Sequence, residues 1–385
     1  MNISWIGITI ETGENIMTLT NYWWLLIWIF AGGLILSIYI PKQHEVVLGK
    51  TEIRWRIAPA FILILPYIIW AGFRSNSFGD TGSYQQLFRE CASSLGEIGT
   101  YLAGVDKDKG FYFFMALEKS ILGNSETLFF IILAALQLLI IMLMCRKYSE
   151  DYWFSIFLFI ASTDYLSWTF NGIRQFTAVV LIYAATPFIV KKKYIPSILI
   201  ILLASTMHQS ALLMIPVIFI VQGKAWNKKT VLCIIACLVA LLFVDQFTNI
   251  MDSMLAETQY VNVVSDYQSW NDDGTNPLRV LVYSIPAVLS LIGLKYIRAE
   301  DSSMINLSVG ASAVVCGIYI ISMVTSGMFL GRLPIYMSLW SQCILLPWEI
   351  NHLFTAKSAR LIKLIAVLCY CVFFFYQMHF TWGIL

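Results

Sequence analysis

Charged residues are scarce in this chain. Only 12% of its 385 residues are Asp, Glu, Lys or Arg, whereas an ordinary soluble domain has about 25%. Hydrophobic residues make up 59% of the sequence and fall in runs of about 15–20, as bilayer-spanning helices do. Such runs must be helical, because an unpaired backbone is too costly in hydrocarbon. The composition therefore argues against a string of soluble domains and predicts one integral membrane domain over residues 1–385.

The motifs of soluble enzymes are also missing. The sequence has no Walker motif, no G-x-G-x-x-G and no H-E-x-x-H, and its Cys and His residues do not cluster as metal ligands. Its eight cysteines form no disulfide pattern. We therefore expect no cofactor and no metal, and the net charge of +2 gives no indication of nucleic-acid binding. Without a nucleotide site, a transfer reaction would need a substrate that is already activated in the membrane.

About twelve apolar segments are candidate membrane spans. The first begins at Tyr22 and has no basic segment or small-residue cleavage site before it, so we expect a retained span rather than a signal peptide. Two segments are short for a bilayer core of about 30 Å and could together form one span. The predicted spans are 22–40, 57–73, 127–145, 152–168, 173–190, 195–206, 209–222, 230–248, 278–294, 303–323, 333–350 and 361–382.

The distribution of Lys and Arg predicts the orientation. With the N-terminus outside, 17 of the 25 basic residues fall in cytoplasmic segments, as the positive-inside rule requires. A single crossing by 195–222 would place the basic cluster at 224–229 outside and the acidic segment 249–277 inside. We therefore expect an even passage through 195–222, either as two short helices or as a re-entrant hairpin with His208 at its tip.

This topology gives two long extracytoplasmic loops and places both termini outside. Loop 74–126 mixes charges, glycines and aromatics, and its part 111–122 has an apolar face typical of an interfacial amphipathic helix. Loop 249–277 carries five acidic residues and no basic residue. We expect the working chemistry on the side of these loops.

Four arginines depart from the orientation bias: Arg74, Arg174, Arg279 and Arg332, each at the outer end of a predicted span. Arginine at a membrane boundary costs free energy unless it snorkels, pairs or binds an anion. Because a guanidinium matches phosphate oxygens, arginines that converge from separate spans could form a phosphate clamp. The alternative is that each snorkels independently or pairs with an outside carboxylate.

Two further residues on this side are candidates for catalysis. His208 lies at the outer junction of the two short helices, and an imidazole can accept a proton from a hydroxyl nucleophile near neutral pH. It could equally be a hydrogen-bonded interface residue. Asp80, in the turn RSNSFGDTGSY, could orient an arginine or a sugar hydroxyl, or it could serve the turn alone.

The remaining candidates surround these residues. Asn171 and Gly172 predict a turn immediately before Arg174. Aromatic residues near this face, among them Tyr84 and Tyr336, could stack on sugar rings or could belong to a membrane-interface belt.

Five segments in a fixed order carry a resemblance to a known family. They are RSNSFGDTGSY (74–84), KGFYFF (109–114), NGIRQ (171–175), STMHQSALL (205–213) and GRLPIY (331–336). Each is short, but the order, and N-x-x-R-Q followed about 30 residues later by H-x-S, resembles the EpsG/Wzy family of bacterial polysaccharide polymerases. The resemblance covers roughly residues 70–340.

The resemblance implies a fold and a reaction. Members have an all-α polytopic architecture similar to the GT-C glycosyltransferases, here with about twelve transmembrane helices. They polymerise undecaprenyl-diphosphate-linked oligosaccharides at the outer face of the bacterial cytoplasmic membrane, without a nucleotide sugar or a required metal. The partners implied are the lipid-linked donor and acceptor, membrane lipids, and as protein partners a chain-length regulator and a flippase.

The resemblance also implies residue roles. Arg174 and Arg332 match the motif arginines that would bind the diphosphate, His208 matches the histidine that would activate the acceptor hydroxyl, and Asp80 matches a loop acid of open role. Arg279 lies where members diverge and rests on topology alone. The predicted substrate-binding residues are Arg74, Arg279, Tyr84, Asn171, Gln175 and Tyr336.

Two other functions remain open. A flippase or transporter of the same lipid-linked sugars would also be polytopic, but such proteins often have two repeated halves and charges near the midplane. The distinctive arginines here gather at one face, and the halves show no similarity, which favours an enzyme. An O-antigen-ligase-like glycosyltransferase, or a membrane acyltransferase, would share most of this chemistry, and only the motif order argues against it.

Overall fold

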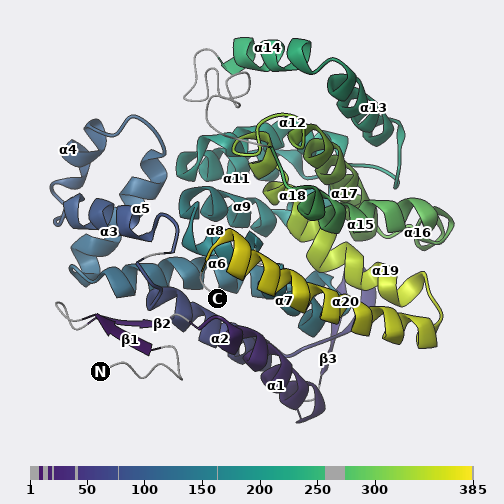
Figure 1. Ribbon diagram of the computed structural model, residues 1–385, viewed down its shortest axis with the longest axis horizontal. Helices are drawn as coiled ribbons and strands as arrows, with labels where there is room; N and C mark the ends of the chain where they lie inside the picture. Colours follow the sequence, from purple (N-terminus) through teal and green to yellow (C-terminus); the bar gives the residue numbers. More distant parts are fainter. Residues whose placement is uncertain are drawn as a thin grey trace. The chain divides into compact units, whose positions relative to one another are not determined.

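The computed structural model describes residues 8–11, 16–19, 21–39, 42–76, 78–162, 164–255 and 274–383. Their regular structure is almost entirely helical, with two short antiparallel hairpins as the exceptions (Figure 1). The chain divides into two compact units. Unit 1 comprises residues 1–186, 195–212 and 360–385, and unit 2 comprises residues 187–194 and 213–359.

Unit 1 contains both hairpins and most of the N-terminal helices. Its elements, some of which extend by a few residues beyond the unit, are β1 (Ile8–Glu11), β2 (Ile16–Leu19), α1 (Trp23–Tyr39), β3 (Gln43–Val47), β4 (Lys50–Arg54), α2 (Ile57–Gly72), α3 (Thr81–Glu90), α4 (Ile98–Ala103), α5 (Lys109–Leu122), α6 (Glu126–Tyr148), α7 (Tyr152–Ala161), α8 (Asp164–Phe170), α9 (Ile173–Ala184), α11 (Tyr194–Met207), η1 (Gln209–Leu213), α20 (Ala356–Tyr376) and η5 (Gln377–Thr381).

Helix α6 is the long central helix of unit 1 and packs against α2, α5, α7 and α9. Its middle carries Gln137, whose Nε2 donates to Thr177 Oγ1 of α9 at 2.9 Å. In α1, the indole of Trp28 donates to the carbonyl of Leu63 in α2 at 2.9 Å. These interhelical hydrogen bonds satisfy polar groups that lipid cannot, so they hold the helices together where the hydrophobic effect is weak.

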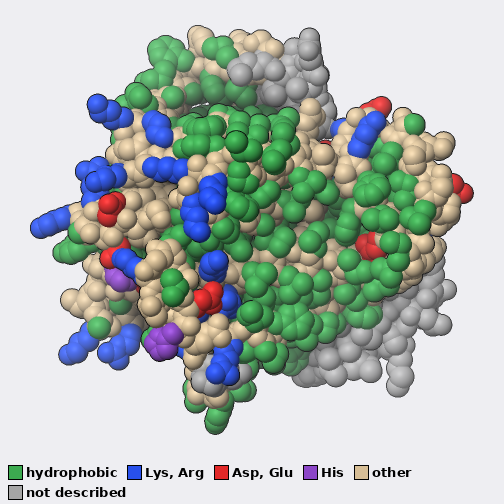
Figure 2. Space-filling model, turned by 180° about the vertical axis from the view of Figure 1, so that it is seen from behind, with side chains coloured by type: hydrophobic (Ala, Val, Ile, Leu, Met, Phe, Trp, Pro, Cys, Tyr) green, Lys and Arg blue, Asp and Glu red, His purple; other side chains and the backbone are tan. Residues whose placement is uncertain are grey.

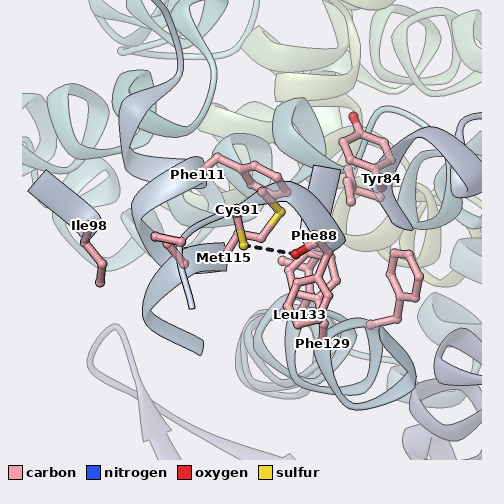
Figure 3. Packing of buried hydrophobic residues seen from close by; sticks show 12 residues of the cluster. Tyr84, Phe88, Cys91, Ile98, Phe111, Met115, Phe129 and Leu133 are labelled. Atoms are coloured by element: carbon pink, nitrogen blue, oxygen red, sulfur yellow. Dashed lines mark hydrogen bonds between the residues drawn. The ribbon is translucent and has the colours of Figure 1, made fainter. Parts of the chain in front are cut away.

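Helices α3, α4 and α5 form a separate group between the end of α2 and the start of α6 (Figure 1). Figure 3 shows the hydrophobic cluster that they share with α6, in which the rings of Phe88 and Phe129 stack at 4.9 Å and Phe111 and Met115 are fully buried. Lys119 Nζ donates to the carbonyls of Phe88 and Cys91 and so satisfies the C-terminal end of α3. The predicted loop 74–126 is therefore a packed helical layer, and α5 includes the predicted helix 111–122.

The hairpin β3–β4 is an element that the sequence analysis did not predict. Leu48 and Gly49 both have positive φ, 51° and 86°, the backbone that a two-residue hairpin turn needs. Arg54 Nε donates to the carbonyl of Lys147 at 3.0 Å, and Arg146 pairs with Glu45 at 2.8 Å. The hairpin is thus attached to the C-terminal end of α6 by two arginines.

Unit 2 is built around α17. Its elements are α10 (Thr186–Val190), α12 (Met214–Ile220), α13 (Lys228–Leu242), α14 (Val244–Leu255), α15 (Pro277–Ile292), α16 (Leu294–Glu300), α17 (Ser303–Ser322), η3 (Leu330–Arg332), α18 (Ile335–Trp340), η4 (Ser341–Leu345) and α19 (Leu346–His352).

Small residues allow close packing on α17. A Cβ at Gly310 would lie 2.7 Å from the carbonyl oxygen of Val221, and one at Gly317 would lie 2.8 Å from Cys237 Sγ. Glycine at such contacts lets backbones approach closely, as is common between membrane helices.

The apolar surface and the helix lengths make this an α-helical membrane protein. Large hydrophobic side chains are exposed on many helices, for example Leu34 and Ile38 of α1 and Val372 of α20, and Figure 2 shows such side chains over much of one face. Within the described ranges, three helices are long and apolar enough to cross a membrane: α6, α17 and the continuous helix 356–381. Two bent pairs raise that number to five if each is one span: α13 with α14 (108°), and α15 with α16 (74°).

Several of the twelve predicted spans are broken into shorter helices. Residues 152–168 form α7 and part of α8, and 173–190 form α9 and α10. Segment 333–350 contains the π-helical turn η4, an irregularity that often bends helices. The chain also breaks at His208, between α11 and η1, where both interpretations of 195–222 place a junction. Most of loop 249–277, residues 256–273 with four of its five acids, lies outside the described residues.

Candidate functional site

Asp108 joins three separate segments of unit 1. It is the N-cap of α5, and its side chain is only 2% exposed. Its Oδ2 accepts a hydrogen bond from Arg174 Nη1 of α9 at 3.0 Å, and its Oδ1 accepts one from the backbone N–H of Gln209 at 3.2 Å. One buried carboxylate thus connects the motif arginine with the residue next to His208. We call Asp108, Arg174 and His208 the arginine–aspartate centre.

Glycines at two positions allow these segments to meet. A Cβ at Gly110 would lie 2.1 Å from Thr206 Oγ1, so only glycine permits the start of α5 to approach the end of α11 this closely. Gly172, at φ 31°, ends the turn before α9, and a Cβ there would lie 2.3 Å from the ring of Trp168. The sequences KGFYFF and NGIRQ therefore supply backbone geometry that the centre needs, and NGIRQ also supplies Arg174.

The electrostatics of the centre follow from partial burial. Burial raises the pKa of the Asp108 carboxyl, and Arg174 and the N–H of Gln209 oppose that rise. Arg174 retains 26% of its side-chain exposure and lies 5.9 Å from the centroid of the Tyr112 ring. Burial also raises the pKa of Tyr84, against the neighbouring charge of Arg174. Arg174 is therefore paired on one side and bordered by two tyrosines.

His208 is half-buried at the break between α11 and η1. Its backbone N–H completes the last turn of α11 by donating to the carbonyl of Ala204, and its ring Nδ1 lies 2.7 Å from Ser210 Oγ. A hydroxyl on Nδ1 orients the ring, which is how a general base is positioned. Because Gln209 bonds to Asp108, the structure brings His208 to the same corner of unit 1 as Arg174.

Asp80 and Asn171 connect two other predicted motifs. The backbone N–H of Asp80 donates to Asn171 Oδ1 at 3.1 Å, and Gly79, at φ 52°, packs against the Asn171 side chain. The Asp80 side chain is exposed, whereas Gln175, one turn beyond Asn171, is buried. The turn at Gly79 and Asp80 is thus held on the N-terminal end of α9.

Arg74 is placed differently from Arg174. It is 3% exposed, and its guanidinium donates to the backbone carbonyls of Ala71, Thr169 and Phe170. Arg74 therefore fastens the end of α2 to the end of α8.

The other predicted residues belong to unit 2, where three segments meet at the C-terminal end of α17. The N–H of Thr275 donates to the carbonyl of Ser322 at 2.8 Å. A Cβ at Gly331 would lie 2.4 Å from Thr275 Oγ1, and one at Gly274 would lie 2.6 Å from the carbonyl oxygen of Met323. This junction brings together the segment before α15 and the turn η3.

Arg279 and Arg332 lie close to this junction in the sequence, a few residues after Thr275 and directly after Gly331. Arg279, in the first turn of α15, lies 5.6 Å from the centroid of the Tyr319 ring of α17. Arg332 ends η3 and is exposed, while Tyr336 of α18 is buried. Unit 2 therefore holds both of its predicted arginines beside one junction.

Sequence reasoning missed Asp108. It lies in the run Asp106-Lys107-Asp108-Lys109, whose alternating charges are typical of a solvated loop. The sequence signal that could have found it is its position directly before KGFYFF. Its φ of 55° is a left-handed backbone that Asp tolerates better than most residues. Only the tertiary contact with Arg174 shows that it is buried.

In the described ranges, no three His, Cys, Asp or Glu side chains come together as metal ligands. A protein-family model with the description EpsG family matches residues 57–382, nearly the whole chain. The match includes Asp80, Asp108, Arg174, His208 and Arg332. No curated protein and no solved structure matches this chain.

Proposed function

The chain belongs to the EpsG family, and from this premise we propose that it is a polysaccharide polymerase. It joins oligosaccharide repeat units that are linked to undecaprenyl diphosphate, by glycosyl transfer at the outer face of the bacterial cytoplasmic membrane. Its architecture is a GT-C-like bundle of about twelve spans. Where a single helix is too short to cross the bilayer, two consecutive short helices together form the span. The arginine–aspartate centre, with His208 beside a preorganised arginine, carries the proposal.

The reaction breaks one bond and forms another. The non-reducing-end hydroxyl of the incoming repeat unit attacks the anomeric carbon of the growing chain. The bond from that carbon to the diphosphate oxygen breaks, and undecaprenyl diphosphate leaves with the electron pair. The hydroxyl proton passes to His208, whose ring is oriented by Ser210.

Arg174 stabilises the departing diphosphate. Asp108 fixes the guanidinium from one side, so the cation is already in place when charge develops on the leaving oxygen. A donor aimed at developing charge stabilises the transition state more than the ground state. Removal of one such donor typically costs about 3–4 kcal/mol of activation free energy.

The remaining residues bind substrate. Arg279 and Arg332, which belong to unit 2, bind phosphate oxygens of the substrate, because the guanidinium fork matches them. Tyr84 and Tyr336 border the sugars, and Asn171 and Gln175 bind them at the N-terminal end of α9, where Asn171 Oδ1 also accepts from the N–H of Asp80. The lipid tails keep donor and acceptor in the membrane plane, which raises their effective concentration.

Purified protein incubated with undecaprenyl-diphosphate-linked repeat units alone tests the proposal. We expect longer lipid-linked oligosaccharides to form, with release of undecaprenyl diphosphate. A flippase would give no new covalent product, and a ligase would need a different acceptor. Unchanged substrate with protein of native helix content would therefore contradict polymerase activity.

A further inference from the structure

The guanidinium of Arg74 is fixed on all sides but one. Nε donates to the carbonyl of Ala71 at 2.6 Å, and Nη1 donates to those of Thr169 and Phe170 at 3.1 and 3.3 Å. The group lies between two aromatic rings, 4.1 Å from the centroid of Phe130 and 4.5 Å from that of Phe170. Nη2 is buried and, within the residues that the structure describes, has no hydrogen-bond partner.

A buried donor of this kind implies a ligand or water. An unsatisfied buried polar group is destabilising, and more so when it is charged. Here the cation is held by contacts from two helix ends, so it cannot turn away to find a partner. Such a preorganised donor gains free energy when an acceptor arrives, because no side-chain entropy remains to be lost.

Arg74 lines a cavity of about 240 Å³ in unit 1. The cavity lies between the end of α2, helix α3 and the start of α6. Drug-sized ligands occupy about 300–1,000 Å³, so this cavity has room for a single ring rather than a whole oligosaccharide. Its polar lining includes Asn76, Gln85, Asn124 and Glu126.

The lining combines donors and acceptors. Gln85 Nε2 donates to Asn76 Oδ1 at 2.8 Å, which orients both amides. The charge of Glu126 is balanced by an ion pair with Arg89. Amides and a compensated carboxylate suit hydroxyl groups, each of which donates one hydrogen bond and accepts others. A phosphate, which is mainly an acceptor, would leave the carboxylate of Glu126 and the amide oxygen of Asn124 without donors.

We propose that this cavity binds one neutral sugar ring, with Arg74 Nη2 donating to a ring hydroxyl and Gln85 and Asn124 completing the contacts. The inference rests on the proposed function, because it names a sugar subsite for the same oligosaccharide substrate. Helix α3 connects the two places: Tyr84 borders Arg174, and the next residue, Gln85, lines the cavity. Consecutive residues of α3 thus contact Arg174 and line the cavity.

Saturation-transfer difference NMR on the full chain in lipid nanodiscs tests the subsite without any lipid-linked substrate. The probes are glucose, galactose, N-acetylglucosamine and rhamnose, with inorganic phosphate as a competitor. We expect Gln85→Ala and Asn124→Ala each to weaken sugar binding about tenfold, the effect of losing roughly one hydrogen bond. Gln86→Ala is the matched control, because the exposed Gln86 on the same helix bonds to Glu90 instead.

Each result has one meaning for the subsite. Binding that is weakened in both variants and retained in the control supports it, and Asn124, being exposed, gives a variant that folds even if Gln85→Ala does not. Equal binding by all variants, no binding of any sugar, or complete displacement by phosphate overturns it. Sugar binding without chain elongation would contradict the polymerase and leave the subsite standing, whereas elongation with unchanged binding in the variants would do the reverse.

Discussion

Arg174 Nη1 donates to Asp108 Oδ2 at 3.0 Å across 66 residues of sequence, and the other oxygen of the same carboxylate accepts from the backbone beside His208. A single buried acid therefore sets the position of both the proposed phosphate ligand and the proposed base. This arrangement makes the contributions of Arg174 and Asp108 to stability interdependent.

Arg174→Ala is expected to abolish chain elongation and to destabilise the outer part of unit 1. The substitution leaves the Asp108 carboxylate buried beside a single N–H donor, at a cost of about 1–3 kcal/mol. In the double variant Arg174→Ala/Asp108→Asn much of that stability returns, since no buried charge remains, while elongation stays lost. Thermal unfolding and product length measure the two effects, and strictly additive stability changes would show that the pair is not coupled.

Arg332→Ala is expected to lower elongation by about 10²–10³-fold without changing stability. Arg332 is exposed, so its removal leaves no cavity and no buried charge. Arg360→Ala, an exposed arginine on the predicted cytoplasmic side, is the matched control and should elongate normally. Full-length polymer from Arg332→Ala would remove this residue from the site.

His208→Ala is expected to slow turnover by about 10²–10⁴-fold while lipid-linked substrate still binds. A lost general base affects the chemical step more than substrate affinity. Ser210→Ala, which removes the hydroxyl 2.7 Å from Nδ1, should have a smaller effect in the same direction. Single-turnover kinetics distinguish these cases, and wild-type turnover by His208→Ala would rule out the base role.

Gly110→Ala is expected to destabilise unit 1 by about 1–3 kcal/mol and to reduce elongation. The added Cβ would lie 2.1 Å from Thr206 Oγ1 and 3.0 Å from the Thr206 backbone, so α5 and α11 must separate and Asp108 must leave Gln209. A Cβ at Gly99, in α4, meets nothing within 4 Å, so Gly99→Ala is the control. Equal melting temperatures for the two variants would contradict the close approach.

The free energy of unfolding is expected to fall as pH rises, because of Glu118. Burial raises the pKa of Glu118 from its ordinary value of 4.5 to about 8, and its Oε2 is unpartnered in the described part of the chain. Between these values the folded protein holds a proton that the unfolded chain has released, so the free energy of unfolding decreases with pH. Glu118→Gln should therefore match the wild type at pH 4.5 and exceed it in melting temperature at pH 9.

The control for Glu118 is Glu97→Gln. Glu97 is exposed at the start of α4, so its removal should leave the pH dependence unchanged. A constant difference in melting temperature between Glu118→Gln and the wild type across this pH range would show that the carboxyl titrates normally.

The fold class follows from sequence because the constraint of the bilayer is local. Any apolar run of sufficient length must satisfy its own backbone, whatever its neighbours do. Some helix breaks could also be predicted from the sequence. Asn171-Gly172 indicates the turn before α9, and the polar STMHQS segment contains the break at His208. The hairpin β3–β4 was not readable, because its turn is Leu48-Gly49 rather than a sequence typical of hairpins.

The site was less predictable than the fold, because burial of a charge is a tertiary property. Arg174 was expected as a phosphate ligand, but Asp108 looks like a solvated loop residue until α5, α9 and η1 are placed together. Lys119 lies on an amphipathic helix where exposure is expected, yet it is buried because the C-terminal carbonyls of α3 need a donor. The sequence predicted that Arg74 binds substrate, but it did not predict that this side chain also joins the ends of two helices.

The bond between Gln137 and Thr177 has a consequence for biogenesis. Gln137 lies in the middle of α6 and is fully buried in the finished protein, where its amide donates to α9. During synthesis α6 enters the bilayer before α9 has left the ribosome, so this amide first meets lipid. We therefore expect nascent α6 to remain beside the insertion machinery until α9 arrives, and Gln137→Leu to release it earlier at the expense of correct docking.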